Sequence, residues 1–254
     1  MEIPGQDLQR FVMNRMKEIV TRVPGVGFVD RKYVGLTPKS RTTKDIFTGI
    51  YMRNAWGGKH SVSGPGSDTD QTRVIINELS ALFGELNIRT VLDCPCGDFH
   101  RMKHVKMKGK DYTGAGIVTD LIQKNRQEYE TDGVHFCELN LIKDELPKVD
   151  LILCRDCLRH FSFRDVFLAL HNICDSESTY LLPTTYTGRQ RNRDISTGQG
   201  HTLNLEAAPF MLPAPLRTIN EECTQGHGAY KDKSLGLWRV ADIRESLQHH
   251  FTPR

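Results

Sequence analysis

Hydrophobic and polar positions follow two different periods along this chain, one typical of buried strands and the other of amphipathic helices. Five short apolar runs, each bounded by glycine, proline or polar residues, predict strands at residues 90–93, 111–115, 134–138, 149–154 and 179–185. Apolar residues spaced three and four positions apart predict helices at residues 8–20, 70–83, 119–129 and 163–173. Strands that alternate with helices in this order indicate an α/β fold with a doubly wound, mostly parallel sheet.

Segments before and after this alternating core extend the fold. Residues 1–69 are predicted to form an N-terminal extension, in which the first helix docks on the domain and residues 26–45 form a polar, extended arm. Residues 70–254 are predicted to form the main domain. In that domain Gly84 is placed to end the helix before the first strand, and residues 235–240 are expected to form a closing strand.

Composition narrows the class of protein. The 254 residues suffice for one α/β domain with an extension. A net charge of +3 argues against a dominating nucleic-acid surface, although it leaves room for a local basic patch. No apolar run approaches the roughly 18 residues of a membrane span, and the cysteine content suits a reducing compartment, so we expect a cytoplasmic protein that does not bind membranes. The sequence defines no oligomeric state.

The most informative segment follows the first predicted strand and reads Thr-Val-Leu-Asp-Cys-Pro-Cys-Gly-Asp-Phe-His at residues 90–100. The carboxyl ends of parallel strands form the ligand-binding crevice of such a sheet, so this turn is expected to face a cofactor. A dinucleotide needs several glycines around its pyrophosphate, whereas this turn has Gly97 alone. A cofactor without phosphate, carrying a nucleoside and an amino-acid tail, would instead meet the carboxylates of Asp93 and Asp98. S-adenosylmethionine (SAM) has this chemistry.

At this motif the sequence resembles the class I SAM-dependent methyltransferases, whose first motif is a strand ending in an acid followed by a glycine-containing loop, here V-L-D-C-P-C-G-D-F. The resemblance implies a Rossmann-like, seven-stranded sheet that closes with an antiparallel hairpin, and SAM as the cofactor. It also implies that an insertion at residues 187–233 recognises the methyl acceptor. The positions expected to bind the cofactor are Trp56, Gly57, Ser63, Gln71, Thr72, Asp93, Cys94, Pro95, Cys96, Gly97, Asp98, Phe99, Gly116, Ile117, Val118, Asn140, Leu141, Arg155 and Asp156.

Two further features bear on the cofactor. The loop at residues 61–68 is rich in glycine and serine and precedes a helix, so its backbone and the helix start at Gln71 and Thr72 are suited to an anion such as the methionine carboxylate. Phe99 and Trp56 are candidates to face the sulfonium cation. An ordinary loop that only orients the helix would show the same composition.

Two positions depart from the resembled family. Its second strand commonly ends in an acid that binds the ribose hydroxyls, and Gly116 stands there in this chain. Its third strand is commonly followed by an Asp near the adenine, where this chain has Asn140, whose amide can still accept a hydrogen bond. Loss of the ribose contact would cost about 1.5–3 kcal/mol. A catalytically silent scaffold protein with the same fold is therefore an alternative interpretation.

The segment after the fourth strand supplies candidate catalytic residues. If its turn is helical, Asp156 and His160 lie four residues apart on one face, where the carboxylate would polarise the imidazole. Such a pair is suited to remove the proton of a hydroxyl during methyl transfer, while a His next to Phe161 is also typical of a half-buried, hydrogen-bonded side chain. We therefore expect O-methylation of a hydroxyl on a sugar, a glycan or another small molecule.

Two other interpretations concern metals and nucleic acids. Buried cysteines commonly act as small apolar side chains, so no metal is expected, although a zinc site would have four candidate ligands in Cys94, Cys96, Cys154 and Cys157. An RNA methyltransferase would gather basic residues beside the pocket, with candidates Lys39, Arg41, Arg189, Arg191 and Arg193. The run Lys231-Asp232-Lys233 is expected on a loop, so it does not form the Lys-Asp-Lys-Glu tetrad of RNA ribose methylation.

Overall fold

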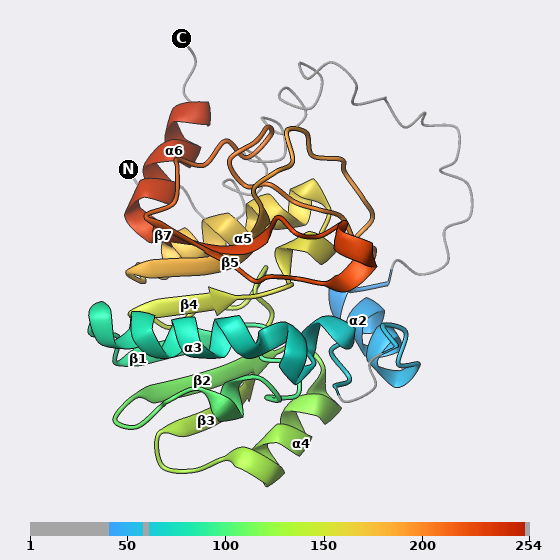
Figure 1. Ribbon diagram of the computed structural model, residues 1–254, viewed down its shortest axis with the longest axis vertical. Helices are drawn as coiled ribbons and strands as arrows, with labels where there is room; N and C mark the ends of the chain where they lie inside the picture. Colours follow the sequence, from blue (N-terminus) through green and yellow to red (C-terminus); the bar gives the residue numbers. More distant parts are fainter. Residues whose placement is uncertain (1–40, 58–60, 252–254) are drawn as a thin grey trace.

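The computed structural model describes residues 41–57 and 61–251. Its strands are β1 (Thr90–Asp93), β2 (Asp111–Gly116), β3 (Val134–Glu138), β4 (Leu151–Cys154), β5 (Tyr180–Tyr186), β6 (Arg217–Asn220) and β7 (Lys233–Arg239). They form a sheet in the order β3-β2-β1-β4-β5-β7-β6 (Figure 1). Neighbours from β3 to β5 are parallel, and β7 runs antiparallel between β5 and β6. The predicted Rossmann-like, mostly parallel sheet of seven strands with a closing antiparallel hairpin is thus confirmed.

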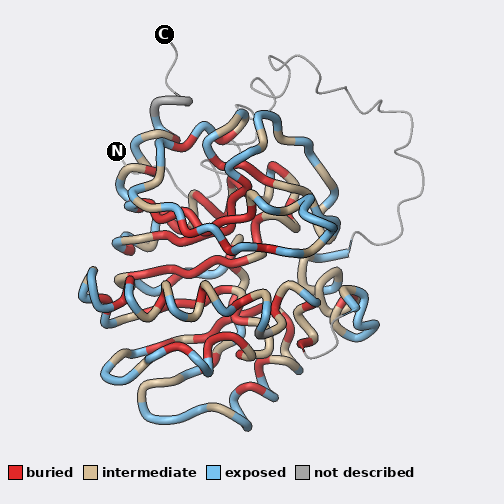
Figure 2. The backbone as a smooth tube through the Cα atoms, viewed as in Figure 1, coloured by how far each residue is buried: buried red, intermediate tan, exposed pale blue. Residues whose placement is uncertain are grey.

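The two faces of this sheet are covered by α3 (Thr69–Glu85), α4 (Thr119–Tyr129), α5 (Phe163–Asp175) and α6 (Val240–Phe251), while α2 (Thr43–Met52) lies beside the carboxyl ends of the parallel strands. One apolar core lies under α3, where Leu79 and Phe83 pack against the central strands. The other core lies under α5 and α6, which contribute Leu170 and Ile243. Figure 2 shows the strands buried along most of their length and the outer faces of the helices exposed. None of the helices described in the structure is long and apolar enough to cross a membrane.

The strands form where buried side chains alternate between the two cores. In β4, Leu151 and Leu153 belong to the core under α3, while Ile152 and Cys154 belong to the core under α5 and α6. A strand that is covered on both faces is apolar at every position, which is why continuous apolar runs predict these strands. The strand begins two residues later than the run at residue 149, because the amide of that residue donates to the Ser178 hydroxyl instead of to a neighbouring strand.

The N-terminal extension differs from the prediction where it is described. The predicted helix at residues 8–20 and most of the predicted arm at residues 26–45 lie outside the described residues. The last part of that arm is helical, because α2 begins at Thr43. Thr42 Oγ1 accepts a hydrogen bond from Asp45 N at 3.2 Å, and Asp45 Oδ2 accepts one from Thr42 N at 2.9 Å, which is a reciprocal capping box. This Thr-x-x-Asp spacing is the sequence signal that was overlooked.

Helix α3 runs past Gly84, which was wrongly expected to end it. The helix ends at Glu85, and Asn87 adopts a φ of +51°, in the left-handed region. Asn87 N donates to Gly84 O at 3.2 Å, and Ile88 N donates to Phe83 O at 3.0 Å. This pair of bonds satisfies the last carbonyl groups of the helix, so an asparagine ends it in the role that glycine more often has.

The C-terminal half contains elements that the sequence did not locate. Strand β6 and helix α6 were not identified, and β7 begins at Lys233, so β6 lies inside the predicted insertion at residues 187–233. The loop between β5 and β6 is part of the main core rather than a separate lobe, because Leu203, Leu205 and Phe210 are fully buried under α5. The division of the chain near residue 69 stays a prediction.

Candidate functional site

A cavity of about 450 Å³ lies at the carboxyl ends of the parallel strands. The last residue of β2 and the residues after β2 and β3 form its first end, which includes Gly116, Ile117, Val118, Asn140 and Leu141. The loop after β1 forms the middle, with Cys94, Pro95, Cys96, Gly97 and Asp98. The segments after β4 and before β7 form the second end, with Arg155, Asp156, Arg159, His160 and Lys233. The structure therefore brings most of the predicted site residues together around one space, where such sheets bind ligands.

The loop after β1 takes its shape from Gly97. This residue has a φ of +59°, and a Cβ atom in its place would lie 2.3 Å from Ser63 Oγ. Asn125 of α4 holds the loop by donating from Nδ2 to Gly97 O at 2.7 Å. Both the left-handed backbone and the lack of space require glycine at this position. The result is a bare stretch of backbone in the middle of the cavity wall.

The glycine- and serine-rich loop at residues 61–68 closes over this turn. Ser61 Oγ donates to Asp98 Oδ1 and Val62 N donates to Asp98 Oδ2, each at 3.0 Å. Residues 62–67 line the cavity as a consequence. Asp98, which was expected to face the cofactor, thus also fastens this loop to the turn after β1.

Asp93 does not contact the cavity directly, which corrects its predicted role. Its side chain is fully buried, and Oδ2 accepts hydrogen bonds from Arg101 Nη2 at 3.0 Å and from Tyr112 Oη at 2.9 Å. Burial raises the pKa of this carboxyl group, although the charge of Arg101 opposes the shift. Because Arg101 itself lines the cavity, Asp93 acts on the site by positioning Arg101.

Phe99 also lies outside the cavity lining, so the structure does not place its ring where it was expected to face a sulfonium cation. Its φ of +58° turns the side chain into the apolar core. There its ring centroid is 5.2 Å from the rings of both Tyr129 and Phe136. A second left-handed residue two positions after Gly97 was not recognisable from the sequence, because phenylalanine rarely adopts this backbone conformation.

Three further expected positions, at the start of α3 and before it, do not line the cavity. Thr72 is buried in α3, and Gln71 Nε2 donates to Thr224 Oγ1 at 2.7 Å, on the loop after β6. Gly57 is exposed. The start of α3 therefore contacts the loop after β6, while the loop at residues 61–68 lines the cavity.

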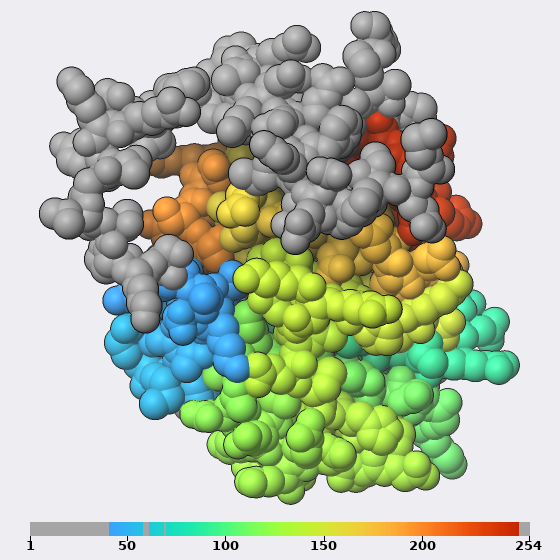
Figure 3. All heavy atoms as spheres, turned by 180° about the vertical axis from the view of Figure 1, so that it is seen from behind, coloured from blue at the N-terminus to red at the C-terminus, as the bar shows by residue number. Residues whose placement is uncertain are grey.

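Helix α2 contributes an aromatic wall that the sequence did not reveal. Thr43, Phe47 and Tyr51 line the cavity, and the Phe47 ring centroid lies 6.3 Å from that of Trp56 and 6.0 Å from that of Phe161. Seen from behind, the blue surface of this segment lies against the green and yellow-green surface of the domain (Figure 3). In the sequence, this wall is indicated by the capping box of α2 and by Phe47 and Tyr51, which lie four residues apart on the helix.

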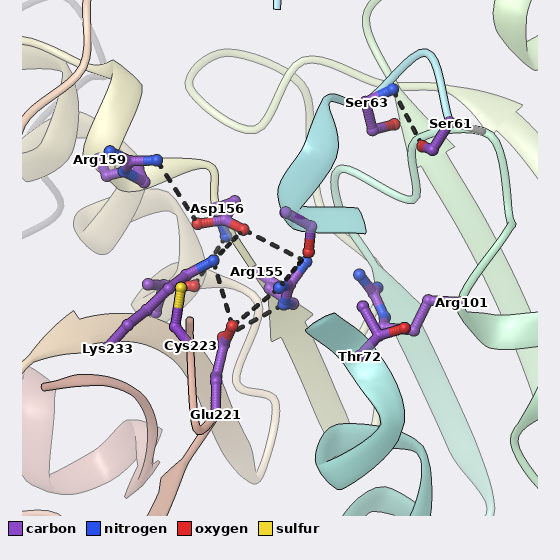
Figure 4. Close-up of polar contacts among 12 residues, drawn as sticks. Ser61, Ser63, Thr72, Arg101, Arg155, Asp156, Arg159, Glu221, Cys223 and Lys233 are labelled. Atoms are coloured by element: carbon purple, nitrogen blue, oxygen red, sulfur yellow. Dashed lines mark hydrogen bonds and ion pairs between the residues drawn. The ribbon is translucent and has the colours of Figure 1, made fainter. Parts of the chain in front are cut away.

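The second end of the cavity is built around a buried network of ion pairs (Figure 4). Arg155 Nη2 lies 2.8 Å from Glu221 Oε2, and Arg155 Nη1 lies 3.2 Å from Asp156 Oδ2. Lys233 Nζ lies 2.6 Å from Asp156 Oδ2 and 3.1 Å from Glu221 Oε2. The sequence gives no signal for Glu221, and the expectation that Lys233 lies on a loop is wrong, because Lys233 is the first residue of the buried strand β7.

The predicted pair of Asp156 and His160 is not formed. Asp156 has a φ of +53°, so the turn is not α-helical, and its carboxylate is bound by Lys233 instead. His160 Nδ1 lies 2.8 Å from Gln199 O. Because a carbonyl oxygen only accepts, Nδ1 carries the proton of the neutral ring and Nε2 is left as an acceptor. Burial and the neighbouring Arg159 guanidinium lower the pKa of His160 to about 4.

The cysteines near the cavity behave as small apolar side chains. Cys94, Cys96, Cys154 and Cys157 are free thiols and are buried. Burial raises the pKa of the Cys94 and Cys96 thiols well above its usual value. In the part of the chain that the structure describes, no group of three or more His, Cys, Asp or Glu side chains is placed to hold a metal ion.

Of the basic residues considered for RNA binding, the four that the structure describes do not line this cavity. Arg189 Nε is paired with Asp232 Oδ2 at 2.8 Å, and Arg191 and Arg193 are exposed. Arg41 faces a second cavity, between α2 and the loop after β5, and Lys39 lies outside the described residues.

Several solved structures similar to this chain are methyltransferases. Magnesium protoporphyrin IX methyltransferase from Synechocystis PCC 6803 with bound SAM has a TM-score of 0.56 at 15% identity, over 80% of this chain and 99% of its own. Human N-acetylserotonin methyltransferase in complex with SAM has a TM-score of 0.53 at 15% identity, over 78% and 60%. Burkholderia thailandensis 1,6-didemethyltoxoflavin-N1-methyltransferase, with bound 1,6-didemethyltoxoflavin and S-adenosylhomocysteine (SAH), has a TM-score of 0.54 at 12% identity, over 84% and 97%.

These likenesses establish the fold of the chain. The chain spans about 60% of the length of the human enzyme. No protein-family model matches the sequence, and a search of curated proteins finds no match. The strand order and the structural similarity together show that the chain has the class I SAM-dependent methyltransferase fold.

Proposed function

We propose that the protein is a SAM-dependent methyltransferase that transfers a methyl group to an oxygen of a small molecule. The observation that carries this proposal is the position of the cavity, which passes from the ends of β2 and β3 across the Gly97 turn to the end of β4. Its volume of about 450 Å³ is typical of small-molecule sites. A bare backbone turn with one glycine suits a phosphate-free cofactor that lies along the wall.

The residues present can be assigned to the parts of such a cofactor. Gly116 and Asn140 would border the nucleoside, and the loop around Gly97, with Arg101 beside it, would border the amino-acid tail. Bound SAM supplies an electrophilic methyl group. The work of the protein is then to hold the acceptor in line with that group and to exclude water, and Trp56 and His160 are the side chains that would position the acceptor.

A small acceptor is supported by the similar structures, whose names describe methylation of small molecules. The hydroxyl of a sugar or glycan, expected from the sequence, belongs to this wider class of oxygen acceptors. A silent scaffold is the second candidate function, and the specific observation in its favour is Gly116 in place of an acid at the end of β2.

Calorimetric titration with SAH tests the proposal. We expect a 1:1 isotherm with the wild-type protein. A flat trace would contradict the enzyme and favour the scaffold.

A matched pair of glycine variants localises the binding. In Gly97→Ala the new methyl group collides with Ser63 Oγ and narrows the middle of the cavity, so we expect at least a tenfold loss of SAH affinity. Gly109→Ala is the control, because Gly109 also has a positive φ of +74° but has nothing within 4 Å of a Cβ atom and lies outside the cavity. Equal affinities of the two variants would show that SAH binds elsewhere.

A further inference from the structure

The second end of the cavity holds an excess of positive charge among the described residues. Arg155, Arg159 and Lys233 supply three cations, against the two carboxylates of Asp156 and Glu221. Arg155 and Lys233 are bound to these carboxylates at distances of 2.6–3.2 Å. Arg159 is the cation left over, since its Nη1 lies 4.0 Å from Asp156 Oδ1. A cation that its neighbours do not neutralise favours an anion in the adjoining space.

The guanidinium of Arg159 is fixed in place with its outer nitrogens open. Its Nε donates to His201 O at 3.3 Å, and its Cζ lies 5.6 Å from the centroid of the Tyr186 ring. Among the described residues, Nη1 and Nη2 donate no hydrogen bond, and 21% of the side chain is exposed. Figure 4 shows the one ion pair of this guanidinium, in which Nη1 lies 4.0 Å from Asp156 Oδ1. Terminal guanidinium nitrogens that are held in this way match the geometry of a carboxylate.

A flat apolar surface lies beside this cation. The ring centroids of Trp56 and His160 are 5.2 Å apart, and those of Phe47 and Trp56 are 6.3 Å apart. His160 directly follows Arg159 in the sequence and lines the same cavity. A methyl acceptor with a flat apolar body and an acidic group would therefore fit here, because its body would lie on the apolar surface and its acidic group would meet the cation.

Neither candidate base at this end is suited to deprotonate an alcohol. Although burial alone would raise it, the pKa of the Asp156 carboxyl is held well below its usual range by Lys233, Arg155 and Arg159. His160 has a pKa of about 4, far below the near-neutral value of an effective general base. An acceptor oxygen that is already ionised in solution needs no base.

We infer that the methyl acceptor is a carboxylate, that Arg159 binds one of its oxygens, and that the other oxygen receives the methyl group. This inference rests on the proposed function and names its substrate class. One carboxylate oxygen forms the new bond to the methyl carbon while the bond from that carbon to the sulfonium sulfur breaks, and the sulfur keeps the electron pair. The products are a methyl ester and the neutral thioether SAH, and no proton is transferred. The net positive charge of SAM adds to the attraction for an anionic acceptor.

Binding of a matched pair of probes to the SAH-loaded protein tests this inference without catalysis. Benzoate and benzyl alcohol share a flat ring and differ in the charged group. Trp56 reports binding by its fluorescence, since the other tryptophan, Trp238, is fully buried away from the cavity. We expect benzoate to bind at least tenfold more tightly than benzyl alcohol, and Arg159→Gln to abolish the difference. Arg191→Gln, which removes an exposed arginine outside the cavity, should preserve it.

The chemical nature of the product gives a second test. With methyl-labelled SAM, and with benzoate and glucuronate set against benzyl alcohol and glucose, we expect label only on the acids, in a form that mild alkali releases as methanol. Alkali-stable label on an alcohol, or equal affinity of the SAH-loaded protein for benzoate and benzyl alcohol, would overturn the inference. Failure of SAH itself to bind would instead overturn the proposed function, so the two failures are distinguishable.

Discussion

Among single residues, Glu221 has the clearest consequence for stability. Its carboxylate is 1% exposed and binds Arg155 and Lys233, which are themselves 1% and 3% exposed. In Glu221→Gln the two buried cations would share the single carboxylate of Asp156, and breaking a buried network in this way costs about 3–5 kcal/mol. We expect a loss of that size in the free energy of unfolding, measured by urea denaturation.

The adjacent glutamate provides the control for this measurement. Glu222 is 69% exposed and its carboxylate lies 3.8 Å from Arg73, so Glu222→Gln should cost less than about 0.5 kcal/mol. Equal effects of the two substitutions would mean that the buried network does not stabilise the fold.

Gly116 is a single residue whose substitution should strengthen the binding of SAH. A Cβ atom at this position would meet Ile122 Cδ1 at 3.4 Å, an ordinary contact, so Gly116→Asp fits the cavity wall. A carboxylate there would accept hydrogen bonds from the ribose, which is worth about 1.5–3 kcal/mol. We therefore expect calorimetry to show SAH binding that is about tenfold tighter or more.

A glycine outside the cavity provides the charge-matched control for this prediction. Gly84→Asp adds the same charge at an exposed position of α3 away from the cavity, and it should leave SAH affinity unchanged. Unchanged affinity of Gly116→Asp would mean that another residue already binds the ribose. Glu138 is the candidate, because it pairs in register with Gly116 and accepts a hydrogen bond from Thr119.

The residues that the sequence could and could not identify differ in a physical way. Gly97 and Asp98 were identifiable, because their spacing after a strand directly reflects a turn at the edge of the sheet. Glu221 and Lys233 were not, because they join Arg155 from segments more than 60 residues away and only the tertiary fold brings them together. Phe99 was misjudged, because its left-handed backbone depends on the packing around it.

Among the elements, α2 has the most testable effect on the site. Its first turn is held by the capping box of Thr42 and Asp45, and Lys44 forms an ion pair with Glu138 beside the cavity. Thr42→Ala should destabilise the helix by about 1 kcal/mol. Native-state hydrogen exchange should then be roughly fivefold faster in α2, while the amides of β1 stay unchanged.

Thr48→Ala is the matched control, because it removes the same side chain from the middle of the helix. Alanine is the better helix former, so exchange in α2 should be equal or slower in this variant. Unaltered exchange in Thr42→Ala would show that packing on the domain, rather than the capping box, sets the stability of α2.

The prediction of elements succeeded where burial made the pattern regular. The bounds of β4 and α5 agree with the sequence prediction to within two residues, because all four residues of β4 and seven residues of α5 are buried in the core. Strand β6 has one buried residue, Ile219, so it carries no apolar run that marks it as a strand. Helix α2 is signalled by its cap rather than by a wide apolar stripe, since Ile50 is its one buried residue.

Across the whole molecule, the cavity depends on segments that are distant in sequence but meet at one edge of the sheet. The turn after β1 faces the loop at residues 61–68, and the segment after β4 faces the start of β7. The sheet order places these segments together, which is why a fold inferred from strand patterns also predicted which segments line one cavity. The chemistry of the site depends on side-chain contacts between distant segments, and the hydrophobic pattern of the sequence does not predict such contacts.

Because the ligand would join these segments, binding should stabilise the entire fold. At 100 times its dissociation constant, SAH should add about 2.7 kcal/mol to the free energy of unfolding. For a chain of this size that corresponds to a rise of about 5–10 °C in the melting temperature, measured by differential scanning calorimetry.

NADH should give no rise in the melting temperature, because the single-glycine turn lacks the backbone arrangement that a pyrophosphate requires. Gly109→Ala should keep the SAH shift relative to its own baseline, and Gly97→Ala should lose about half of it or more at the same SAH concentration. A rise with NADH but not with SAH would contradict the assignment of the cavity, because a dinucleotide would then be the ligand that this edge of the sheet binds.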